Sequence, residues 1–582
     1  NHQAIKDFFP NAQLFGFTGT PIFDENATYS IREGEYATYK TTEDIFQKRL
    51  HAYTITHAID DENVLRFHID YFKGNKNQKQ GEVISRQAVV EAILNKHNAA
   101  TNSKKFNAIL ATASINNAIE YYHIFKELQK IKQAENPEYV PLNITCVFSP
   151  PSQLIAQQGD QQSQKNAADI KQLQEDLAQE REDNKQNPEE KKKALMDIIA
   201  DYNERFGTNH NIYEFDLYYQ DIQKRIKDQQ YSNADYPHRN KIDITIVVDM
   251  LLTGFDSKYL NTLYVDKNLK YHGLIQAFSR TNRVLNDTKP YGNILDFRSQ
   301  QDAVNQAIAL FSGEDNDKAR EIWLVDPAPV MIDRYKKAVE KLGLFMQEHN
   351  LVNEPQEVYN LKGDAARIAF VQNFKEVQRL KTQLDQYTDL DEGQKAEIQT
   401  ILPDDTLQEF RSSYLETAKQ LREVQQKEGE NVPPEIQQLD FEFVLFASAV
   451  IDYDYIMNLI ADSTQKKPAK QHMTKAQVIS LLSSSSNMMD EQEDLTEYIN
   501  SLDWSVGQDV EKLRKGYDTF KDDKYNKEIA SIANKHGLQT AELKTFIEKI
   551  MARMIFDGEQ LTDLLSPLNL SWKERRPKEL AL

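Results

Sequence analysis

The sequence predicts an α/β domain built on a parallel sheet, followed by an all-α region. Up to about residue 300, short apolar runs typical of buried strands alternate with stretches of helical spacing. This alternation indicates parallel strands joined by crossover helices. After about Arg298, strand-like runs largely disappear and apolar residues recur at helical spacing instead. The change at this point separates the two parts.

In the α/β part, each expected strand is an apolar run that ends at polar or turn-forming residues. The run at residues 14–21, LFGFTGTP, predicts a short buried strand that enters a tight loop. The strands expected after it cover residues 64–69, 108–112, 144–148, 244–248, 262–265 and 292–296. The expected helices cover residues 86–94, 115–130 and 273–283.

One segment of the α/β part differs in composition. Residues 153–193 are rich in Gln, Glu, Lys and Asn and nearly free of aromatic residues. Such a composition is typical of a solvated insertion, here with one helical stretch. Because charge runs of this kind are usually wet surface, we assign the segment no chemistry.

The all-α part is expected to contain helices over residues 331–347, 365–386, 406–427 and 441–462. Residues 389–392 and 431–434 have the character of connectors or helix starts. A polar stretch at 462–470 separates a final helical domain that runs to the end of the chain.

Length and composition describe an ordinary globular protein. The chain has 582 residues, 40% of them hydrophobic and 27% charged, which corresponds to about three or four domains. The sequence contains neither an apolar run of the roughly 20 residues that span a bilayer nor a signal-peptide pattern. We therefore expect a cytoplasmic protein outside the membrane. The missing initiator Met leads us to expect that the chain begins inside a longer protein.

Charge and cysteine content exclude some functions. A net charge of -20 argues against a chain that coats nucleic acid by electrostatics alone, although a DNA motor needs only a local positive groove. The single cysteine, Cys146, excludes an intrachain disulfide and a cysteine-based zinc site. His51, His57 and His68 do not have the spacing of metal ligands on one helix, so no metal site is predicted.

The strongest candidate motif is the run QAFSRTNR at residues 276–283. On a helix, Gln276, Arg280 and Arg283 would lie within about 60° of one another. Guanidiniums on one face suit bidentate contact with phosphate oxygens, including the charge that develops on a transferring phosphoryl group. The alternative is a solvent-exposed basic stripe. The position at the edge of an α/β sheet favours the phosphate interpretation.

Three shorter motifs follow expected strands. The run TGFD at 253–256 has a Gly that lets the backbone approach a phosphate at the carboxyl end of a strand, or it is a plain turn. The run TGTP at 18–21 offers two hydroxyls that could relay hydrogen bonds between a nucleotide site and a neighbouring domain, or it is a hydroxyl-rich turn. Thr112 and Ser114 could hold a DNA phosphate with the amides of the next helix, or cap that helix.

In order and approximate spacing, these motifs resemble those of superfamily 2 helicases. TGTP is similar to motif III, ILATAS to the motif IV region, LLTGFD to motif V and QAFSRTNR to motif VI. The longer block from residue 244 to 276, together with residues 323–330, 554–559 and 570–576, resembles the motor (R) subunit of type I restriction-modification enzymes. Ser279 and Asn282 stand where typical helicases have Gly, which suits this family rather than a DEAD-box RNA helicase.

The resemblance implies a RecA-like parallel-sheet fold and four parts. These are the end of a first RecA-like domain (1–30), a second RecA-like domain (31–300, with its insertion at 153–193), a helical domain (301–460) and a C-terminal helical domain (461–582). It also implies that the nuclease, the phosphate loop and the Mg²⁺-binding acids lie upstream, because this sequence has no G-x-x-x-x-G-K-[ST]. ATP and Mg²⁺ are the implied cofactors, bound mainly by that upstream half.

The resemblance also implies roles for individual residues. Those that act at the ATP γ-phosphate or border the nucleotide are Gln276, Arg280, Arg283, Gly254 and Asp256. Those that couple hydrolysis to motion are Thr18, Gly19 and Thr20. Those that follow the phosphates of double-stranded DNA are Thr112, Ser114 and Thr253. The helical region would dock on the methyltransferase and specificity subunits.

The implied function is that of the C-terminal part of an ATP-dependent DNA translocase and endonuclease subunit, a type I site-specific deoxyribonuclease of the bacterial cytoplasm. The isolated chain is expected to be inactive. One alternative is a docking module with a degenerate RecA-like fold, which the acidic balance and the long helical region favour. Another is a superfamily 2 translocase of the chromatin-remodelling or repair type.

Overall fold

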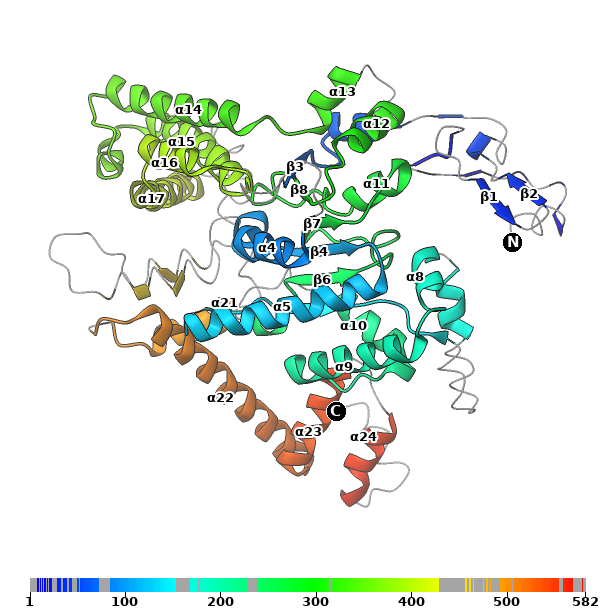
Figure 1. The fold of residues 1–582 in the computed structure, drawn as a ribbon. Helices are drawn as coiled ribbons and strands as arrows, with labels where there is room; N and C mark the ends of the chain where they lie inside the picture. The colour runs from blue at the N-terminus through cyan, green and yellow to red at the C-terminus, as the bar shows by residue number, and fades with distance from the viewer. Residues whose placement is uncertain are drawn as a thin grey trace.

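In the computed structural model, the α/β part is organised around one six-stranded sheet in which every pairing is parallel. The strand order is β3-β8-β7-β4-β6-β5. Because parallel strands need crossover connections, helices lie between most successive strands and pack around the sheet (Figure 1). The prediction of an α/β domain followed by an all-α region is confirmed.

The structure describes residues 53–72, 84–137, 139–152, 168–175, 177–227, 238–312, 316–428, 492–504, 506–553 and 558–568. It also describes scattered residues before 53 and between 456 and 482, and residue 578.

The strands are β1 (Tyr29–Arg32), β2 (Glu35–Thr38), β3 (Phe67–Tyr71), β4 (Asn107–Thr112), β5 (Ile144–Cys146), β6 (Ile244–Val247), β7 (Leu260–Asp266) and β8 (Gly292–Asp296). The α/β helices are α3 (Ile55–Asp60), α4 (Arg86–Ala100), α5 (Ile115–Glu135), α8 (Ala178–Asp183), α9 (Pro188–Phe206), α10 (Phe215–Lys227), α11 (Tyr271–Phe278), α12 (Gln301–Ser312) and α13 (Asn316–Trp323). The later helices are α14 (Ala328–Glu348), α15 (Asp364–Asp385), α16 (Glu392–Ile401), α17 (Asp404–Glu428), α21 (Gln492–Ser501), α22 (Val510–His536), α23 (Thr540–Arg553) and α24 (Gly558–Leu565).

The central strands are buried along their whole length, which explains why they appear in the sequence as continuous apolar runs. Every residue of β4, β6 and β7 is buried, as expected for strands covered on both faces. Helices α4 and α5 lie side by side over the sheet (Figure 1). On β5, Tyr218 of α10 is fully buried and donates its hydroxyl hydrogen bond to the carbonyl of Cys146 at 2.9 Å.

Two expectations for the α/β part are wrong. In the predicted buried strand at residues 14–21, Phe15 is 65% exposed and residues 15 and 16 are not in a strand, while Leu14, Phe17 and Gly19 lie outside the described residues. The insertion at 153–193 is also more than wet surface, because the side chain of Glu180 within it is fully buried. Composition could not reveal the burial of Glu180, because it depends on contacts with residues 31 to 70 positions away.

The helical region has its own core. The buried side chains of α14, α15 and α17 form one cluster with residues as far along the chain as Tyr517, and a smaller cluster joins α22, α23 and α24. Helices α14–α17 group on one side of the sheet domain and α22–α24 extend along another (Figure 1). The predicted boundary at residue 460 stays a prediction.

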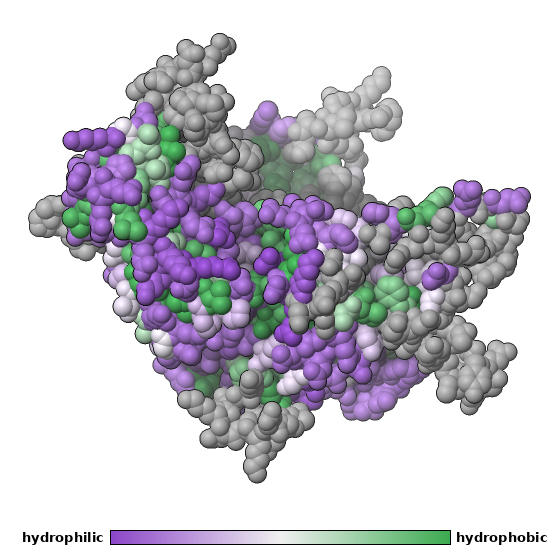
Figure 2. Space-filling view, turned by 90° about the horizontal axis from the view of Figure 1, so that it is seen from above, coloured by the Kyte–Doolittle hydropathy of each residue, from purple (hydrophilic) through white to green (hydrophobic). Residues whose placement is uncertain are grey.

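The helical region joins the sheet at the β3–β8 edge. The hydroxyl of Tyr291 donates to the carbonyl of Gln383 at 2.5 Å, and His68 Nε2 lies 3.1 Å from Asp389 Oδ1. On the face seen from above, hydrophilic residues dominate the described surface and the hydrophobic patches among them are separate (Figure 2). Among the described residues, no helix combines the length and the apolar character needed to cross a bilayer.

Candidate nucleotide and DNA site

The two predicted arginines follow helix α11 instead of lying on it. The helix ends at Phe278, and the hydroxyl of Thr281 donates to the Phe278 carbonyl at 2.8 Å. Beyond it, the N–H of Leu65 donates to the carbonyl of Asn282 at 2.8 Å, and Arg283 forms an antiparallel bridge with Val64. The predicted helix through Arg283 is therefore wrong, because the chain leaves α11 to pair with the segment before β3.

Both arginines contact the loop that contains the predicted TGFD motif. The guanidinium of Arg280 donates to the carbonyl of Phe255, and its Nε donates to the carbonyl of Gln276 at 3.0 Å. Arg283 Nε donates to Asp256 Oδ1 at 2.6 Å. The Arg283 hydrogen bond holds the pKa of Asp256 below its usual value, and burial lowers the pKa of Arg280. Motifs that are 20 or more residues apart thus form one polar cluster.

The loop between β6 and β7 runs from the carboxyl ends of the strands back to their amino ends. Because these strands are parallel, the chain must return to the amino edge before β7 can begin. Asp256 lies four residues before Leu260, and its partner Arg283 lies beside the residues that precede β3. The expected position at the carboxyl ends of the strands is therefore correct for the start of the loop and wrong for Asp256.

The backbone of this loop adopts two left-handed conformations. Leu251 has φ +64° and Gly254 has φ +72°. A Cβ atom at Gly254 would meet no other atom, so space does not explain the glycine. Its positive φ does, because residues with a side chain rarely adopt this conformation. Thr253 is exposed beside it, where its hydroxyl can reach a ligand.

The predicted TGTP segment meets α11 through one side-chain hydrogen bond. Gln276 Nε2 donates to Thr20 Oγ1 at 2.8 Å, across 256 residues of sequence. Within the motif, the N–H of Thr20 also donates to Thr18 Oγ1 at 3.1 Å. Gly19 lies outside the described residues. The bond connects the hydroxyl segment to Gln276, which lies four residues before Arg280.

Thr112 and Ser114 differ in what their hydroxyls can reach. Thr112 is fully buried, and its hydroxyl donates to the carbonyl of Val247 at 2.9 Å. Ser114 is half-buried and caps α5 by accepting the N–H of Asn117 at 3.2 Å. The hydroxyl of Thr112 thus links β4 to β6 in this structure, and Ser114 is the more accessible of the two.

Two residues that support the cluster, Lys289 and Gly292, lie outside the predicted motifs. The fully buried Lys289 donates from Nζ to the carbonyls of Lys258 at 2.8 Å and Leu260 at 3.0 Å, which fixes the chain just after Asp256. Burial lowers its pKa well below the usual lysine value. Gly292 allows the close approach of the arginine segment, because a Cβ atom there would lie 2.3 Å from Thr281 Oγ1. The sequence contains no local signal for either role.

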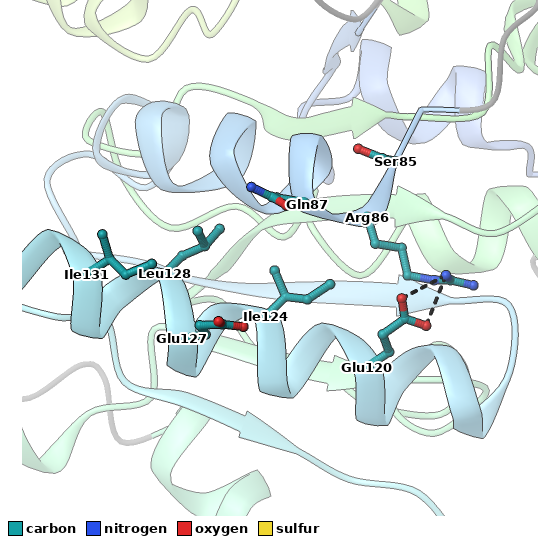
Figure 3. A pocket seen from close by; sticks show the side chains of 8 residues that line it. All are labelled: Ser85, Arg86, Gln87, Glu120, Ile124, Glu127, Leu128 and Ile131. Atoms are coloured by element: carbon teal, nitrogen blue, oxygen red, sulfur yellow. Dashed lines mark hydrogen bonds and ion pairs between the residues drawn. The ribbon is translucent and has the colours of Figure 1, made fainter.

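A hollow of about 420 Å³ lies between α4 and α5, away from this cluster (Figure 3). Isoleucine and leucine side chains of α5 form its apolar wall, and Arg86 and Glu120 form an ion pair at 3.0 Å at one end. None of the predicted site residues lines it.

Comparison with family models assigns most of the chain. Residues 323–582 match the model described as the C terminal of subunit R of type I restriction and modification enzymes, and residues 104–299 match type I restriction enzyme subunit R domain 3. Residues 1–107 match the SWI2/SNF2 ATPase model. The segments that contain the predicted motifs thus fall within the second and third matches.

Curated relatives cover the whole chain. It is 27% identical over 605 aligned residues to the type I restriction enzyme SauCOLORF180P endonuclease subunit of Staphylococcus aureus, an alignment that includes 100% of this chain and 58% of that protein. It is 29% identical to the SsaAORF53P endonuclease subunit of Staphylococcus saprophyticus, with 99% and 58% covered. The HindI endonuclease subunit of Haemophilus influenzae is 25% identical over 50% of this chain and 23% of its own length. The chain therefore spans a little over half the length of the first two.

Proposed function

Because the chain belongs to the family of type I restriction enzyme R subunits, we propose that it supplies the arginine side of an ATP cleft and one DNA-tracking domain. The parent protein would be an ATP-dependent double-stranded DNA translocase and endonuclease. The observation that carries this proposal is the hydrogen bond from Gln276 to Thr20. It joins the hydroxyl segment to the arginine segment, as coupling between two motor domains requires.

The chemistry of the arginine cluster suits a transferring phosphoryl group. Arg280 and Arg283 now contact a carbonyl and a carboxylate. A γ-phosphate offers more acceptor oxygens and more negative charge, so it can replace both partners with bidentate, charge-assisted bonds. In this role Gln276 supports the arginines, Gly254 and Asp256 border the nucleotide, and Thr18 and Thr20 transmit the change. Phosphoryl transfer depends mainly on such positioning and charge stabilisation.

ATP and Mg²⁺ are the cofactors that this function requires. The guanidiniums fit the phosphates of ATP, whereas the described residues include no group of three or more His, Cys, Asp or Glu side chains that could hold a metal ion. The sequence also has no phosphate loop. In this proposal, the phosphate loop and the acids that bind Mg²⁺ belong to other parts of the subunit.

Double-stranded DNA is the proposed substrate of movement. Ser114 and Thr253 are the accessible hydroxyls near the sheet that can contact its phosphates, and Thr112 would act through the strand it holds. The helical region after residue 298 would dock on the methyltransferase and specificity subunits in the bacterial cytoplasm. In support, the helical region has a hydrophobic core beside the sheet domain and can present a surface of its own.

The decisive experiment is Arg280→Ala in the intact subunit, assembled with its partner subunits. An arginine that stabilises phosphoryl transfer contributes about 10³–10⁵ in turnover, so translocation should be lost while DNA binding remains. Arg334→Ala is the matched control, since Arg334 pairs with Asp326 on the surface of the helical region. Normal translocation by the Arg280 variant would refute the assignment, as would robust ATP turnover by this chain alone.

A further inference from the structure

The polar insertion contributes a buried carboxylate that no motif indicates. Glu180 of α8 has no exposed area. Its carboxylate accepts three backbone N–H groups, from Ser149 at 2.6 Å, Asp249 at 3.0 Å and Met250 at 3.3 Å. Ser149 follows β5, and Asp249 and Met250 follow β6. One side chain therefore ties together the loops after two neighbouring strands.

A second carboxylate of α8 reaches a third loop. Asp183 Oδ2 accepts the N–H of Ile115 at 2.8 Å, at the start of α5 and directly after Ser114. The N–H of Gln179 donates to Asp249 Oδ2 at 3.0 Å, which adds another contact to the β6 loop. The strands β4, β6 and β5 are neighbours in the sheet. This short helix therefore contacts the three loops that follow the carboxyl ends of these strands.

The burial of Glu180 is costly, so its hydrogen bonds indicate a specific role. Burial raises the pKa of the Glu180 carboxyl, and the backbone N–H groups of Ser149 and Asp249 act against this rise. A carboxylate is retained in such a place only when its hydrogen bonds are satisfied. Here they are satisfied by the backbone of the loop after β5 and of the loop after β6, and the second of these loops contains Thr253.

The loop after β6 connects the contacts of α8 to the arginines. At its start, Lys267 pairs with Asp249 and donates to the carbonyl of Val248 at 2.8 Å. At its end, Phe255 and Asp256 contact Arg280 and Arg283. At most seven positions of one loop separate Asp249 and Met250, which contact Glu180, from Phe255 and Asp256, which contact the arginines.

We propose that Glu180 is a positioning residue and that α8 braces the loops after β4, β5 and β6. Through this brace, DNA contact at Ser114 or Thr253 sets the position of the loop that holds Arg280 and Arg283. The inference rests on the proposed function, and it assigns the coupling of DNA contact to ATP turnover to the polar insertion.

The test uses the intact subunit assembled with its partners, in the presence of duplex DNA. Glu180→Gln keeps the size of the side chain but turns an amide N–H₂ toward backbone N–H groups. DNA-stimulated kcat should fall about tenfold to a hundredfold, the loss typical of a small misplacement of catalytic groups, with the KM for ATP little changed. Glu182→Gln is the control, because Glu182 is exposed on the same helix and pairs with Lys185. That variant should behave like the wild type.

A second substitution separates positioning from packing. Glu180→Asp is shorter but keeps the carboxylate, so it should recover part of the kcat that Gln loses, whereas a role in packing alone would make Asp the worse variant. Asp183→Asn tests the half-buried end of the brace if the Glu180 variants fold poorly, and it should also lower DNA-stimulated kcat. Wild-type stimulation in these variants would overturn the inference. If Arg280→Ala is inactive in the same assay, that result refutes the brace alone and leaves the proposed function intact.

Discussion

Two carboxylates of the α/β domain form pairs of nearly the same length in opposite environments. Asp243 Oδ2 lies 2.7 Å from His238 Nε2, and Asp256 Oδ1 lies 2.6 Å from Arg283 Nε. The Asp243 side chain is fully buried, whereas that of Asp256 is 69% exposed. The distance between partners therefore does not distinguish a structural pair from an exchangeable one.

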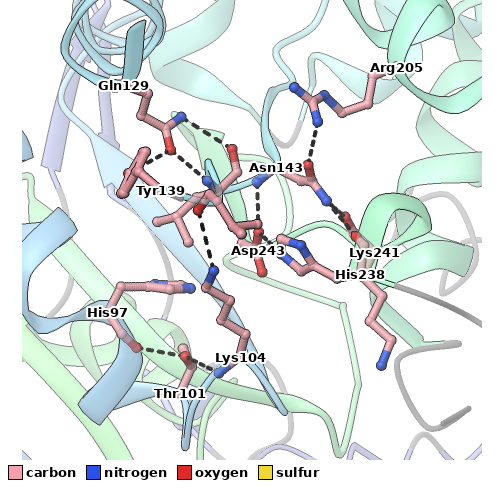
Figure 4. A network of polar contacts seen from close by, with 12 residues as sticks. His97, Thr101, Lys104, Gln129, Tyr139, Asn143, Arg205, His238, Lys241 and Asp243 are labelled. Atoms are coloured by element: carbon pink, nitrogen blue, oxygen red, sulfur yellow. Dashed lines mark hydrogen bonds and ion pairs between the residues drawn. The ribbon is translucent and has the colours of Figure 1, made fainter. Parts of the chain in front are cut away.

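The surroundings of the two pairs explain their different roles. Asp243 also accepts the N–H of Asn143 at 2.6 Å, and the Asn143 side chain contacts the carbonyls of His238 and Lys241 and the guanidinium of Arg205 (Figure 4). Burial raises the pKa of Asp243, but the His238 hydrogen bond and charge outweigh it, so the pKa is lowered. The Asp243 pair is closed off from solvent, whereas the Asp256–Arg283 pair is open to it, as the proposed exchange of Asp256 for a phosphate requires.

The largest effect is expected from Asp243→Ala. The substitution leaves His238 and the Asn143 N–H without their buried acceptor, and breaking a buried pair costs about 3–5 kcal/mol. Denaturant unfolding would measure this loss in the free energy of unfolding, and hydrogen exchange of the β4 and β6 amides would locate it in the sheet. Asp197→Ala is the control, because Asp197 is exposed on α9. Equal stability of the two variants would break the comparison.

Acid should destabilise the same buried region. Burial lowers the pKa of His97 from 6.5 to about 4. The negative charge of Asp243 opposes this shift, and the positive charges of Lys104 and His238 add to it. The folded state therefore binds fewer protons than the unfolded state between these values. The contribution of His97 to the free energy of unfolding is therefore fully present above pH 6.5, and about 3 kcal/mol of it is lost as the pH falls toward 4. The lowered pKa of Asp243 extends the loss to still lower pH.

Replacing His97 tests this pH dependence. In His97→Gln, unfolding measured between pH 7.5 and 5 should lose most of its slope, whereas His123→Gln, at an exposed position of α5, should keep it. An unchanged slope in the His97 variant would place the acid sensitivity elsewhere in the domain.

The two pairs also mark how far the sequence predicts the molecule. The parallel sheet was predictable because strands such as β4 are buried at every residue and so appear as apolar runs. The arginines and the TGFD loop could be singled out because phosphate chemistry restricts residue type and spacing, and their phosphate role stays a proposal. Their mutual contact stays outside the reach of such patterns, because it depends on where the β6–β7 connection ends.

The residues that sequence patterns missed depend on tertiary contacts. The end of α11 is set by pairing with Val64 and by the close approach of Gly292 to Thr281, neither of which leaves a local signal. Glu180 lies in the run AQERED, whose composition is that of a solvated helix. Its burial follows from N–H groups that are 31 to 70 residues away. Charge-rich composition therefore predicts exposure only on average.

The smallest effect on stability, with a specific effect on function, is expected from Asp256→Ala. Exposed ion pairs contribute about 0–1 kcal/mol, so unfolding should change little and salt should screen what remains. Because Arg283 loses the acceptor that holds it at the arginine cluster, ATP turnover by the intact subunit should fall about tenfold, corresponding to about 1.4 kcal/mol of barrier. Asp287→Ala, in the exposed turn after Arg283, should leave turnover unchanged. A stability loss as large as that of Asp243→Ala would make the Asp256–Arg283 pair structural, whereas lost turnover with retained stability identifies it as the exchangeable partner of the nucleotide site.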